Sequence, residues 1–432
     1  MKKTRSQPKT WRKVKLGEYI DIIRGISYSS SDLKKSDDSI YLVNLKNVER
    51  GGGFRIDGLK EYSGSYKNEQ LVNPGDIIIA LTDLTPNAEI VGMPALIPFL
   101  EKPACISMDL VKIQIKKGDL DKRYLYYLLN TREYKGWIRG FASGVNVLHL
   151  NTDGILEFET SIPEDINEQK RIASILSAFD DKIELNNKII KILEEMAQEV
   201  FKEWFIKFNF PVEFEVKNEK LKVKSLGYKD VGGKFIDSEL GKIPEGWKTT
   251  TLEEIMNLRR EKFKSYDKWK NEKLLDLGRF PTKSLAINSY GRGEEIKTSA
   301  FKFYKGDILF GAVRPYFHKV IIAPFDGVTN QSVFVIFPKK EEFYSYLITI
   351  LFSESTINYA TNMASGTKMP VLKYEDLANM NIVLPDFKIL SIFNEIGDKF
   401  YKILIEKVKE NQTLSALRDL LLPKLMSGEI II

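Results

Sequence analysis

Apolar residues return at steps of four and three positions through the middle of the chain, a spacing that predicts one long amphipathic helix. The seam of this helix runs without a break through Ile172, Leu176, Phe179, Ile183, Asn186, Ile190, Leu193, Ala197, Val200 and Trp204. Asn167 stands where an N-cap is expected, shortly after Pro163. A helix of about 35 residues is about 50 Å long, so we expect a rod that separates the sequence on either side of it.

One position of this seam is polar. A buried Asn in a seam between helices lowers stability but specifies the register, because it needs a polar partner. A second, less regular apolar pattern closes the chain and supplies Asn411 as a candidate partner for Asn186. Leu422-Pro423 is expected to end or kink this second helix. We therefore predict that two antiparallel helices pair through Phe179, Ile183, Asn186, Asn187, Ile190, Leu193, Phe400, Leu404, Asn411, Leu414 and Leu417.

Three segments of the first half return in the same order in the second half, which indicates a duplicated unit. The matched pairs are "TWRKVKLGEY" (10–19) with "GWKTTTLEEI" (246–255), "NPGDIIIALTD" (73–83) with "YKGDILFGAVR" (304–314), and "FASGVNVLHLNTDGILEFETSIP" (141–163) with "MASGTKMPVLKYEDLANMNIVLP" (363–385). A long helical pattern follows each copy of the last pair. The offset falls from 236 to 231 to 222 residues, so the copies share a framework and differ in their insertions.

These patterns predict an α+β fold in which two similar α/β domains are separated by two long antiparallel helices that form a coiled coil. Gly75-Asp76 and Gly306-Asp307 are typical of a tight turn that leads into a buried strand. The predicted boundaries are 1–163 for the first domain, 164–206 for the first helix, 207–243 for a connector, 244–385 for the second domain and 386–432 for the second helix.

Composition indicates a folded chain, and its charge is compatible with a polyanionic partner as well as with an ordinary solvated surface. The chain is 43% hydrophobic and has a net charge of +6. Residues 248–305 hold 14 basic and 8 acidic side chains and so a net +6 of their own, which is compatible with phosphate contacts. A single cysteine, Cys105, excludes an intramolecular disulfide. Because no apolar run approaches the roughly 20 residues that span a bilayer, we expect a soluble cytoplasmic protein without a membrane contact.

Motifs for catalysis are not found in the sequence. It contains no GxxxxGK[ST] loop, no Gly-rich turn suited to S-adenosylmethionine or a dinucleotide, and no Asn-Pro-Pro-aromatic signature. One Cys with two His is too few ligands for a structural zinc site. We interpret His149 and His318 as ordinary surface or boundary residues. The acidic segments at 163–165 and 385–386 precede helices, so we interpret them as helix caps rather than as a nuclease centre.

The chain resembles the specificity (S) subunit of type I restriction-modification systems. The resemblance covers nearly the whole length and is carried by "SIPEDINEQKRIASILSAFDDKIELNNKIIKILEEMAQEVFKEWF" (161–205), "GKIPEGWKTTTLEEI" (241–255) and "LRDLLLPKLMSGEI" (417–430). One departure is that the start of the second helix lacks a counterpart of Glu168-Gln169, so the contact made there is expected to differ between the halves.

The resemblance implies a DNA-recognition subunit without catalysis of its own. Each target-recognition domain would read one half of an asymmetric, interrupted site in double-stranded DNA, and the helices would set the spacing and bind two modification (methyltransferase) subunits. Restriction subunits would join through the modification subunits. No cofactor is expected on this chain, since S-adenosylmethionine and ATP belong to the partner subunits. The alternatives are a self-contained DNA methyltransferase or nuclease and a coiled-coil adaptor that binds only proteins.

Base reading requires hydrogen-bonding side chains on loops, and phosphate contacts require Lys and Arg. In the first domain the candidate DNA-binding residues are Arg24, Asn44, Lys46, Asn47, Arg50, Thr82, Asn87, Arg139, Ser143 and Asn146. In the second domain they are Arg259, Arg260, Lys262, Lys264, Arg279, Lys283, Arg292, Arg314, Gln331 and Lys368. Each of these side chains also suits a solvated surface or a turn.

Overall fold

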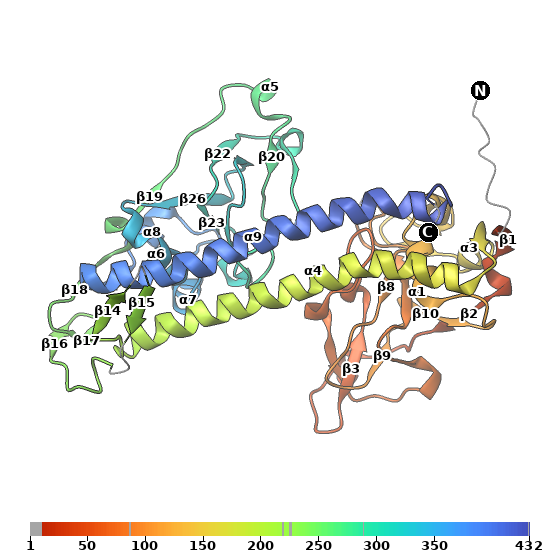
Figure 1. Cartoon of the computed structure of the whole chain (residues 1–432), viewed down its shortest axis with the longest axis horizontal. Helices are drawn as coiled ribbons and strands as arrows, with labels where there is room; N and C mark the ends of the chain where they lie inside the picture. The colour runs from red at the N-terminus through yellow and green to blue at the C-terminus, as the bar shows by residue number, and fades with distance from the viewer. Residues whose placement is uncertain (1–10, 86–87, 218–219, 224–226, 288, 431) are drawn as a thin grey trace. The chain divides into compact units, whose positions relative to one another are not determined.

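Two long helices, α4 (Ile166–Phe201) and α9 (Phe387–Met426), take part in both compact units of the chain (Figure 1). The computed structural model describes residues 11–85, 88–217, 220–223, 227–287, 289–430 and 432. Unit 1 comprises Met1–Asp181 with Ser415–Ile432, and unit 2 comprises Lys182–Leu414. The boundary therefore falls inside both helices. No helix in the described ranges combines the length and the apolar content needed to cross a membrane.

Unit 1 is built on two four-stranded sheets. Its strands are β1 Trp11–Lys15, β2 Ile20–Arg24, β3 Ile40–Val43, β4 Lys60–Tyr62, β5 Leu71–Val72, β6 Ile77–Ala80, β7 Thr82–Asp83, β8 Pro94–Leu96, β9 Ala104–Ile106, β10 Leu110–Ile115, β11 Ala142–Ser143, β12 Leu148–Leu150 and β13 Glu159–Pro163. Its shorter helices are α1 Lys122–Leu129, α2 Arg132–Arg139 and α3 Asp153–Leu156. The first sheet has the antiparallel order β2-β10-β6-β8, and the second has the order β4-β3-β9-β5 with β3 and β9 parallel.

Unit 2 repeats both sheets. Its strands are β18 Lys248–Thr251, β19 Met256–Leu258, β20 Lys273–Leu274, β21 Gly291–Arg292, β22 Phe301–Phe303, β23 Ile308–Gly311, β24 Val320–Ile322, β25 Gly327–Thr329, β26 Val333–Pro338 and β27 Asn381–Leu384. Its shorter helices are α5 Tyr266–Trp269, α6 Tyr344–Leu351, α7 Glu354–Met363 and α8 Tyr374–Ala378. The orders β19-β26-β23-β24 and β21-β20-β25-β22 match those of unit 1, including one parallel pair, β20 with β25. The predicted duplication is thus present in the strand order.

The segment between α4 and β18 carries hairpins rather than a bare linker. α4 continues into a π-helical turn, Lys202–Ile206, and the hairpins are β14 Phe214–Lys217 with β15 Lys220–Val223 and β16 Phe235–Ser238 with β17 Gly241–Pro244 (Figure 1). Trp247, which begins the second repeat, is 5% exposed because Phe205 and Phe210 pack on it, with ring centroids 5.9 and 4.8 Å away. Aromatic packing therefore attaches this segment to unit 2.

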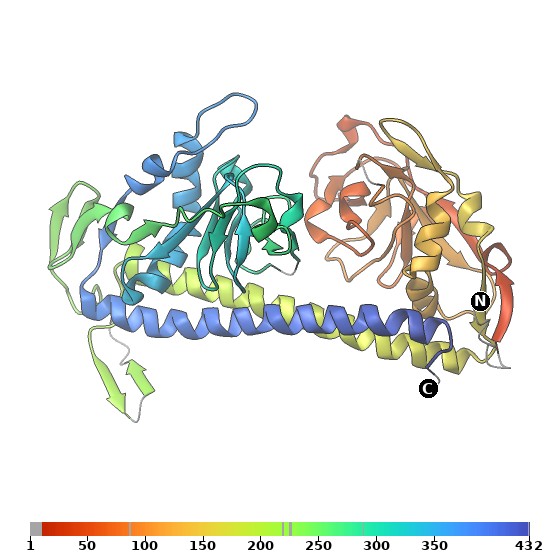
Figure 2. The ribbon, with the colours of Figure 1, turned by 90° about the horizontal axis from the view of Figure 1, so that it is seen from above.

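α4 and α9 pack together in opposite directions (Figure 2). In unit 2, Asn186 Nδ2 donates to Asn411 Oδ1, and Asn411 Nδ2 donates to Asn187 Oδ1, both at 2.9 Å. In unit 1, Arg418 Nη1 donates to Asp180 Oδ1 at 2.6 Å. Asn186 is fully buried and Asn411 is 1% exposed, so a one-residue slip would break buried hydrogen bonds.

The sequence placed one seam residue of α9 incorrectly. The apolar residues predicted to pair the helices are buried or half-buried, apart from Leu417, which is 43% exposed. The step after Leu414 is four residues rather than three, so Arg418 faces Asp180 and the burial continues to Leu425, which is 1% exposed. The mixed steps of three and four in this part of the sequence allowed both phases.

The helix ends also differ in part from expectation. Asp165 Oδ1 accepts a hydrogen bond from the backbone N–H of Asn167 at 2.9 Å, so Asp165 caps α4 and the prediction of Asn167 as the N-cap is wrong. Asp386 caps α9 in the same way through the N–H of Lys388 at 2.8 Å. Both acidic segments are therefore caps, as interpreted. α9 does not end at Pro423 but continues to Met426, because Pro423 removes only one N–H close to the helix end.

The start of α9 lacks the Glu-Gln pair that α4 has at Glu168-Gln169, and the two helix starts are held in different ways. Gln169 is fully buried in unit 1, where Oε1 accepts from the N–H of Asp121 at 2.8 Å and Nε2 donates to the carbonyls of Asp119 and Pro163 at 3.1 and 2.9 Å. Four residues after the capping aspartate of α9 stands Leu390, which is 2% exposed. Hydrogen bonds thus hold the helix start in unit 1, and apolar packing holds it in unit 2.

Cys105 lies on β9 in a small apolar cluster with Ile26, Leu42 and Tyr62. It is fully buried. Burial raises the pKa of its thiol to about 12, so the thiolate that reacts with oxidants and electrophiles is scarcely populated.

Candidate nucleic-acid interface

In unit 1 a turn follows the buried strand β6 and is organised by one buried carboxylate. Asp83, 1% exposed, accepts hydrogen bonds from the backbone N–H groups of Thr85, Ile90 and Val91 at 2.6, 2.6 and 2.9 Å. Burial alone raises the pKa of Asp83, but hydrogen bonds from these residues outweigh it and hold the pKa below its ordinary value. The ionised carboxylate thus fixes both ends of the turn, and Leu84 stands 69% exposed on it.

A hairpin pairs with this turn. β12 is hydrogen-bonded to β7 on one side and to β11 on the other. Its tip needs Gly144, which has φ +136° and where a Cβ would lie 2.0 Å from the carbonyl oxygen of Val147. Ser143 and Asn146 are exposed, and Val145 is 99% exposed.

Unit 2 builds the same arrangement after β23. Val313 forms a bridge to Val371, which also pairs with Ser365, so a second hairpin lies beside the turn that follows the central strand. Gly366 has φ +116° at the position corresponding to Gly144. Lys368 is exposed, and Met369 is 57% exposed. The two units therefore share a backbone frame but present different side chains on it.

The structure divides the candidate residues of unit 1 into two groups. The exposed candidates are Arg24, Lys46, Arg50, Arg139, Ser143 and Asn146. Asn87 lies outside the described residues. The prediction was wrong for Asn44, Asn47 and Thr82, which are 5%, 0% and 9% exposed.

Each of these buried side chains is used inside unit 1. Asn44 accepts from the N–H of Lys46 and donates to the carbonyl of Gly58, while Asn47 donates to the carbonyl of Arg55. The Thr82 hydroxyl donates to Asp109 at 3.1 Å. The spacing Asn44-x-x-Asn47 is that of a capping box, and this spacing in the sequence indicates that both side chains bond the backbone.

Unit 2 divides in the same way. Its exposed candidates are Arg260, Lys262, Lys264, Lys283, Arg292, Gln331 and Lys368. Arg314 is half-buried, and its Nη2 donates to the carbonyl of Lys368 at 3.3 Å.

Two half-buried arginines of unit 2 are held by carboxylates, which corrects their assignment as free DNA contacts, whereas Arg260 and Arg292 form exposed ion pairs with Glu375 and Glu294 at 3.4 Å. Arg259 donates from Nε and Nη2 to Asp307 at 2.9 and 3.1 Å. Arg279 bridges Asp276 and Glu295 at 2.9 and 2.6 Å. Bidentate and doubly paired guanidinium groups of this kind stabilise the fold.

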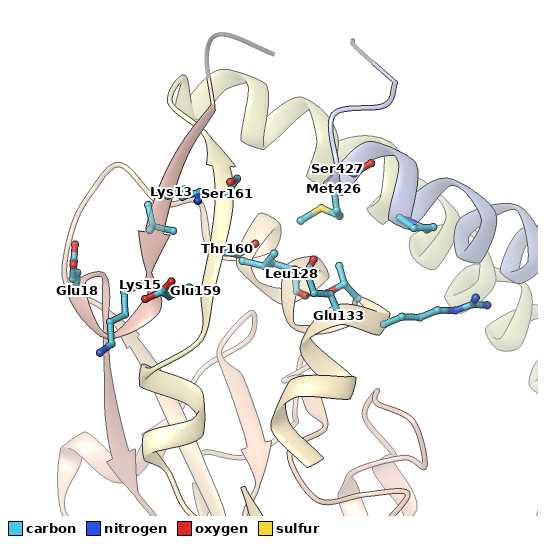
Figure 3. A pocket seen from close by; sticks show the side chains of 14 residues that line it. Lys13, Lys15, Glu18, Leu128, Glu133, Glu159, Thr160, Ser161, Met426 and Ser427 are labelled. Carbon is cyan, nitrogen blue, oxygen red and sulfur yellow. Dashed lines mark hydrogen bonds between the residues drawn. The ribbon is translucent and has the colours of Figure 1, made fainter. Parts of the chain in front are cut away.

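Two surface cavities of unit 1 differ in charge. A cavity of about 320 Å³ beside the turn is lined by Lys46, Arg50 and Arg55 with one carboxylate, Asp57. A larger cavity of about 770 Å³ lies where β1 and β13 meet the end of α9 (Figure 3). Its charged lining is balanced, with Lys13, Lys15 and Arg132 against Glu18, Glu133 and Glu159. Only the smaller cavity has the positive charge that suits a phosphate.

Clusters that could hold a metal ion are absent from the described residues. His149 is exposed on β12, as expected. His318, however, is 4% exposed, which corrects its interpretation as a surface residue, and its Nε2 lies 2.9 Å from the carbonyl oxygen of Phe352. Burial lowers the pKa of His318, so the neutral ring is a structural hydrogen-bonding group.

A buried carboxyl group on α4 positions the segment next to Lys283. Glu194, 6% exposed, accepts from the Ser284 hydroxyl and the N–H of Leu285 at 2.8 and 2.6 Å. Burial raises the pKa of Glu194 to about 7. Because the folded state binds this proton more tightly than the unfolded state, the contribution of Glu194 to stability is fully present below about pH 4.5 and is lost as pH rises to about 7.

Glu194→Gln should therefore remove a pH-dependent part of the free energy of unfolding. The free energy of unfolding of the variant minus that of wild type should rise by on the order of 3 kcal/mol from pH 5 to pH 8, because Gln carries no charge to bury. Urea unfolding followed by circular dichroism at several pH values measures this difference. A constant difference across that range would contradict the prediction.

Comparison with known proteins relates both halves of the chain to one family. The family model described as type I restriction modification DNA specificity domain matches residues 8–195 and 244–416. The chain is 29% identical over 334 residues to the type I restriction enzyme MjaIX specificity subunit of Methanocaldococcus jannaschii, which covers 73% of this chain and 71% of the relative. It is 23% identical over 444 residues to the MjaVIII specificity subunit of the same organism, covering 98% and 93%.

A solved structure shares the fold. The crystal structure of the type I restriction-modification system S subunit from M. genitalium superposes with a TM-score of 0.53 at 17% identity, covering 98% of each chain. The α+β class, with two similar halves and two long helices packed together, is confirmed. Since the family model matches both halves, the chain belongs to the type I restriction-modification DNA specificity family and is a non-catalytic specificity subunit of such a system.

Proposed function

We propose that unit 1 and unit 2 each read one half of an asymmetric, bipartite site in double-stranded DNA. In this proposal α4 and α9 set the number of base pairs between the halves, and each unit docks one modification subunit. The reading domains are 1–163 and 244–385, the spacer helices are 164–206 and 386–432, and 207–243 is the connector.

The observation that carries this proposal is the shared turn and hairpin with unlike side chains. Backbone hydrogen bonds and a positive-φ glycine fix the frame in both units. The tip presents Ser143 and Asn146 in one unit and Lys368 in the other. Different hydrogen-bonding groups on equivalent frames favour different half-sites, because base edges are distinguished by their pattern of donors and acceptors.

Exposed cations in both units suit the DNA backbone. Lys46 in unit 1 and Lys262 and Lys264 in unit 2 are exposed, and the smaller cavity of unit 1 has a net positive lining. Phosphate contacts of this kind make affinity fall steeply with salt. An adaptor that binds only proteins would show weak and salt-insensitive association with DNA.

Exposed apolar residues on the helices support docking of modification subunits. Within unit 2, α4 exposes Leu185, Ile192 and Met196 by 49%, 54% and 45%. Within unit 1, α9 exposes Leu417 and Leu420 by 43% and 56%. Counted from the paired Asn186 and Asn411, Ile192 and Leu417 are equivalent positions, each six residues further along its helix. One similar apolar patch in each unit matches a complex with two modification subunits.

Catalysis belongs to the partners in this proposal. S-adenosylmethionine would bind the modification subunits, and ATP would bind restriction subunits that join through them. Since the substrate is cellular DNA, we place the complex in the cytoplasm.

Exchange of one reading domain tests the proposal. The chain is co-expressed with its modification subunit, and methylated positions are mapped in host DNA. Replacing residues 1–155 by the matching part of a relative should change one half-site and leave the other half-site and the spacer unchanged. Simultaneous change of both half-sites, or methylation without a bipartite site, would exclude it.

A further inference from the structure

A turn of unit 2 holds a strained backbone. The 3-10 turn η9 (Pro315–Phe317) lies between Arg314, with φ +52°, and His318, with φ +51°. Left-handed conformations are uncommon for residues other than glycine, and they persist only where the surroundings enforce them. Such strain is typical of functional sites, which makes this turn a candidate for a specific role.

Neighbouring elements enforce the turn from both sides. The N–H of Arg314 donates to the carbonyl of Pro370 in the hairpin at 2.8 Å, and the carbonyl of His318 accepts from the N–H of Lys283 at 3.0 Å. The buried ring of His318 lies 4.8 Å from that of Phe352. The turn is therefore preorganised, and binding through it requires little ordering.

The turn presents two aromatic rings to solvent. Tyr316 and Phe317 are 49% and 41% exposed, and their ring centroids are 4.7 Å apart. The neighbouring hairpin adds exposed Met369 and Val371, at 57% and 40%. We call Tyr316, Phe317, Met369 and Val371 the aromatic patch. The backbone bonds of Arg314 to Pro370 and of Val313 to Val371 hold the two segments next to each other, and exposed apolar residues gathered in this way mark a binding site.

Cations border the aromatic patch. Lys319 Nζ lies 6.0 Å from the ring centroid of Phe317. Lys283 and Lys368 are exposed on the adjoining segments, with Lys283 paired to Glu354 at 2.7 Å. Lys319 Nζ also donates to the carbonyl of Leu277, so Lys368 and the exposed Lys283 are the cations open to solvent. Exposed rings with cations on adjoining segments suit nucleic acid, because bases stack on the rings while phosphates meet the charges.

We propose that Tyr316 and Phe317 enter the base stack of the DNA duplex at one step in or beside the half-site read by unit 2. The inference rests on the proposed function and adds a distortion of the duplex to it. The turn of unit 1 carries Leu84 instead of a ring pair, so stacking of aromatic rings on bases is expected at the half-site of unit 2 only.

The test uses the chain assembled with its modification subunits. The probe is a duplex of the mapped target with 2-aminopurine placed in turn at each position of both half-sites, because this base brightens when it is unstacked. Wild type should give a several-fold rise at one position of the second half-site. Tyr316→Ala/Phe317→Ala should lose that rise and bind about 10- to 100-fold more weakly, with the same slope of affinity against salt.

Matched variants separate stacking from loss of fold. Tyr316→Phe/Phe317→Tyr keeps both rings and should retain the signal. Tyr290→Ala removes an exposed ring, 47% exposed, from another ring pair of unit 2 and should bind as wild type. A base flipped out by a modification subunit gives a signal that persists in the alanine variant at saturating protein.

Three results separate the two proposals. Wild-type affinity and fluorescence in the alanine variant would overturn the stacking role. Loss of a modification subunit from the purified variant complex would also overturn it, since the patch would then be a protein contact. If the wild-type complex itself prefers no DNA sequence, the proposed function fails, whatever the variants do.

Discussion

Lengthening α4 and α9 together by one heptad should lengthen the spacer between the half-sites by about three base pairs. Seven helical residues add about 10 Å, and B-DNA rises about 3.4 Å per base pair. The insertion duplicates residues 182–188 in α4 and 409–415 in α9, which contain the hydrogen-bonded Asn186 and Asn411. Native packing is therefore repeated rather than disrupted, and methylation should move to sites with the longer spacer.

The measurement is the map of methylated positions in host DNA. A matched control inserts the heptad into α4 alone, which leaves one of the two copies of Asn186 without Asn411 as a partner and should destabilise the pair of helices. The double insertion should keep the wild-type unfolding transition. Retention of the original spacer by the folded double variant would eliminate the helices as the determinant of spacing.

Charging the exposed apolar residues of α4 should release one of the two modification subunits. Ile192→Glu with Met196→Glu leaves the seam intact, because both side chains face solvent. Placing two carboxylates in an apolar contact should weaken it by about 100-fold or more, as loss of interface hot spots does. Adding Leu417→Glu and Leu420→Glu should release the second subunit and abolish methylation.

Native mass spectrometry of the co-expressed complex counts the subunits. The control exchanges the charges of an ion pair on α4, Lys191→Glu with Glu195→Lys, which lie 3.8 Å apart and are exposed. This variant should assemble as wild type. Full assembly of the apolar-to-Glu variants would place the docking surface elsewhere.

Long-range order was the part of the fold that the sequence predicted best. The seam of α4 and the three repeated segments extend over many residues, so local exceptions do not hide them. Asn186 and Asn411 were identifiable because a polar residue in an apolar seam needs a partner. The residues of α9 that face α4 after Asn411 could not be identified from the sequence, because apolar residues follow at steps of both three and four. Only the hydrogen bond to Asp180 selects Arg418 over Leu417.

The candidate site was predicted less well, because residue type does not reveal burial in a loop. Asn44 and Thr82 have the chemistry of base-reading side chains but satisfy backbone and carboxylate groups inside unit 1. Arg259 has the charge of a phosphate-contacting side chain, but Asp307 of the Lys-Gly-Asp turn neutralises it. Tyr316 and Phe317 are not among the residues predicted to bind DNA, because those candidates are all polar or charged. Aromatic residues next to a strand usually belong to the core.

The inert thiol of Cys105 makes this chain convenient for spectroscopy. With its one native sulfhydryl fully buried and un-ionised, an introduced cysteine on an exposed position such as Ser143 or Lys368 would be the sole point of dye or spin-label attachment. Two such positions form a label pair without background. Its resonance energy transfer, recorded as target DNA is added, would follow the two hairpins during recognition in solution.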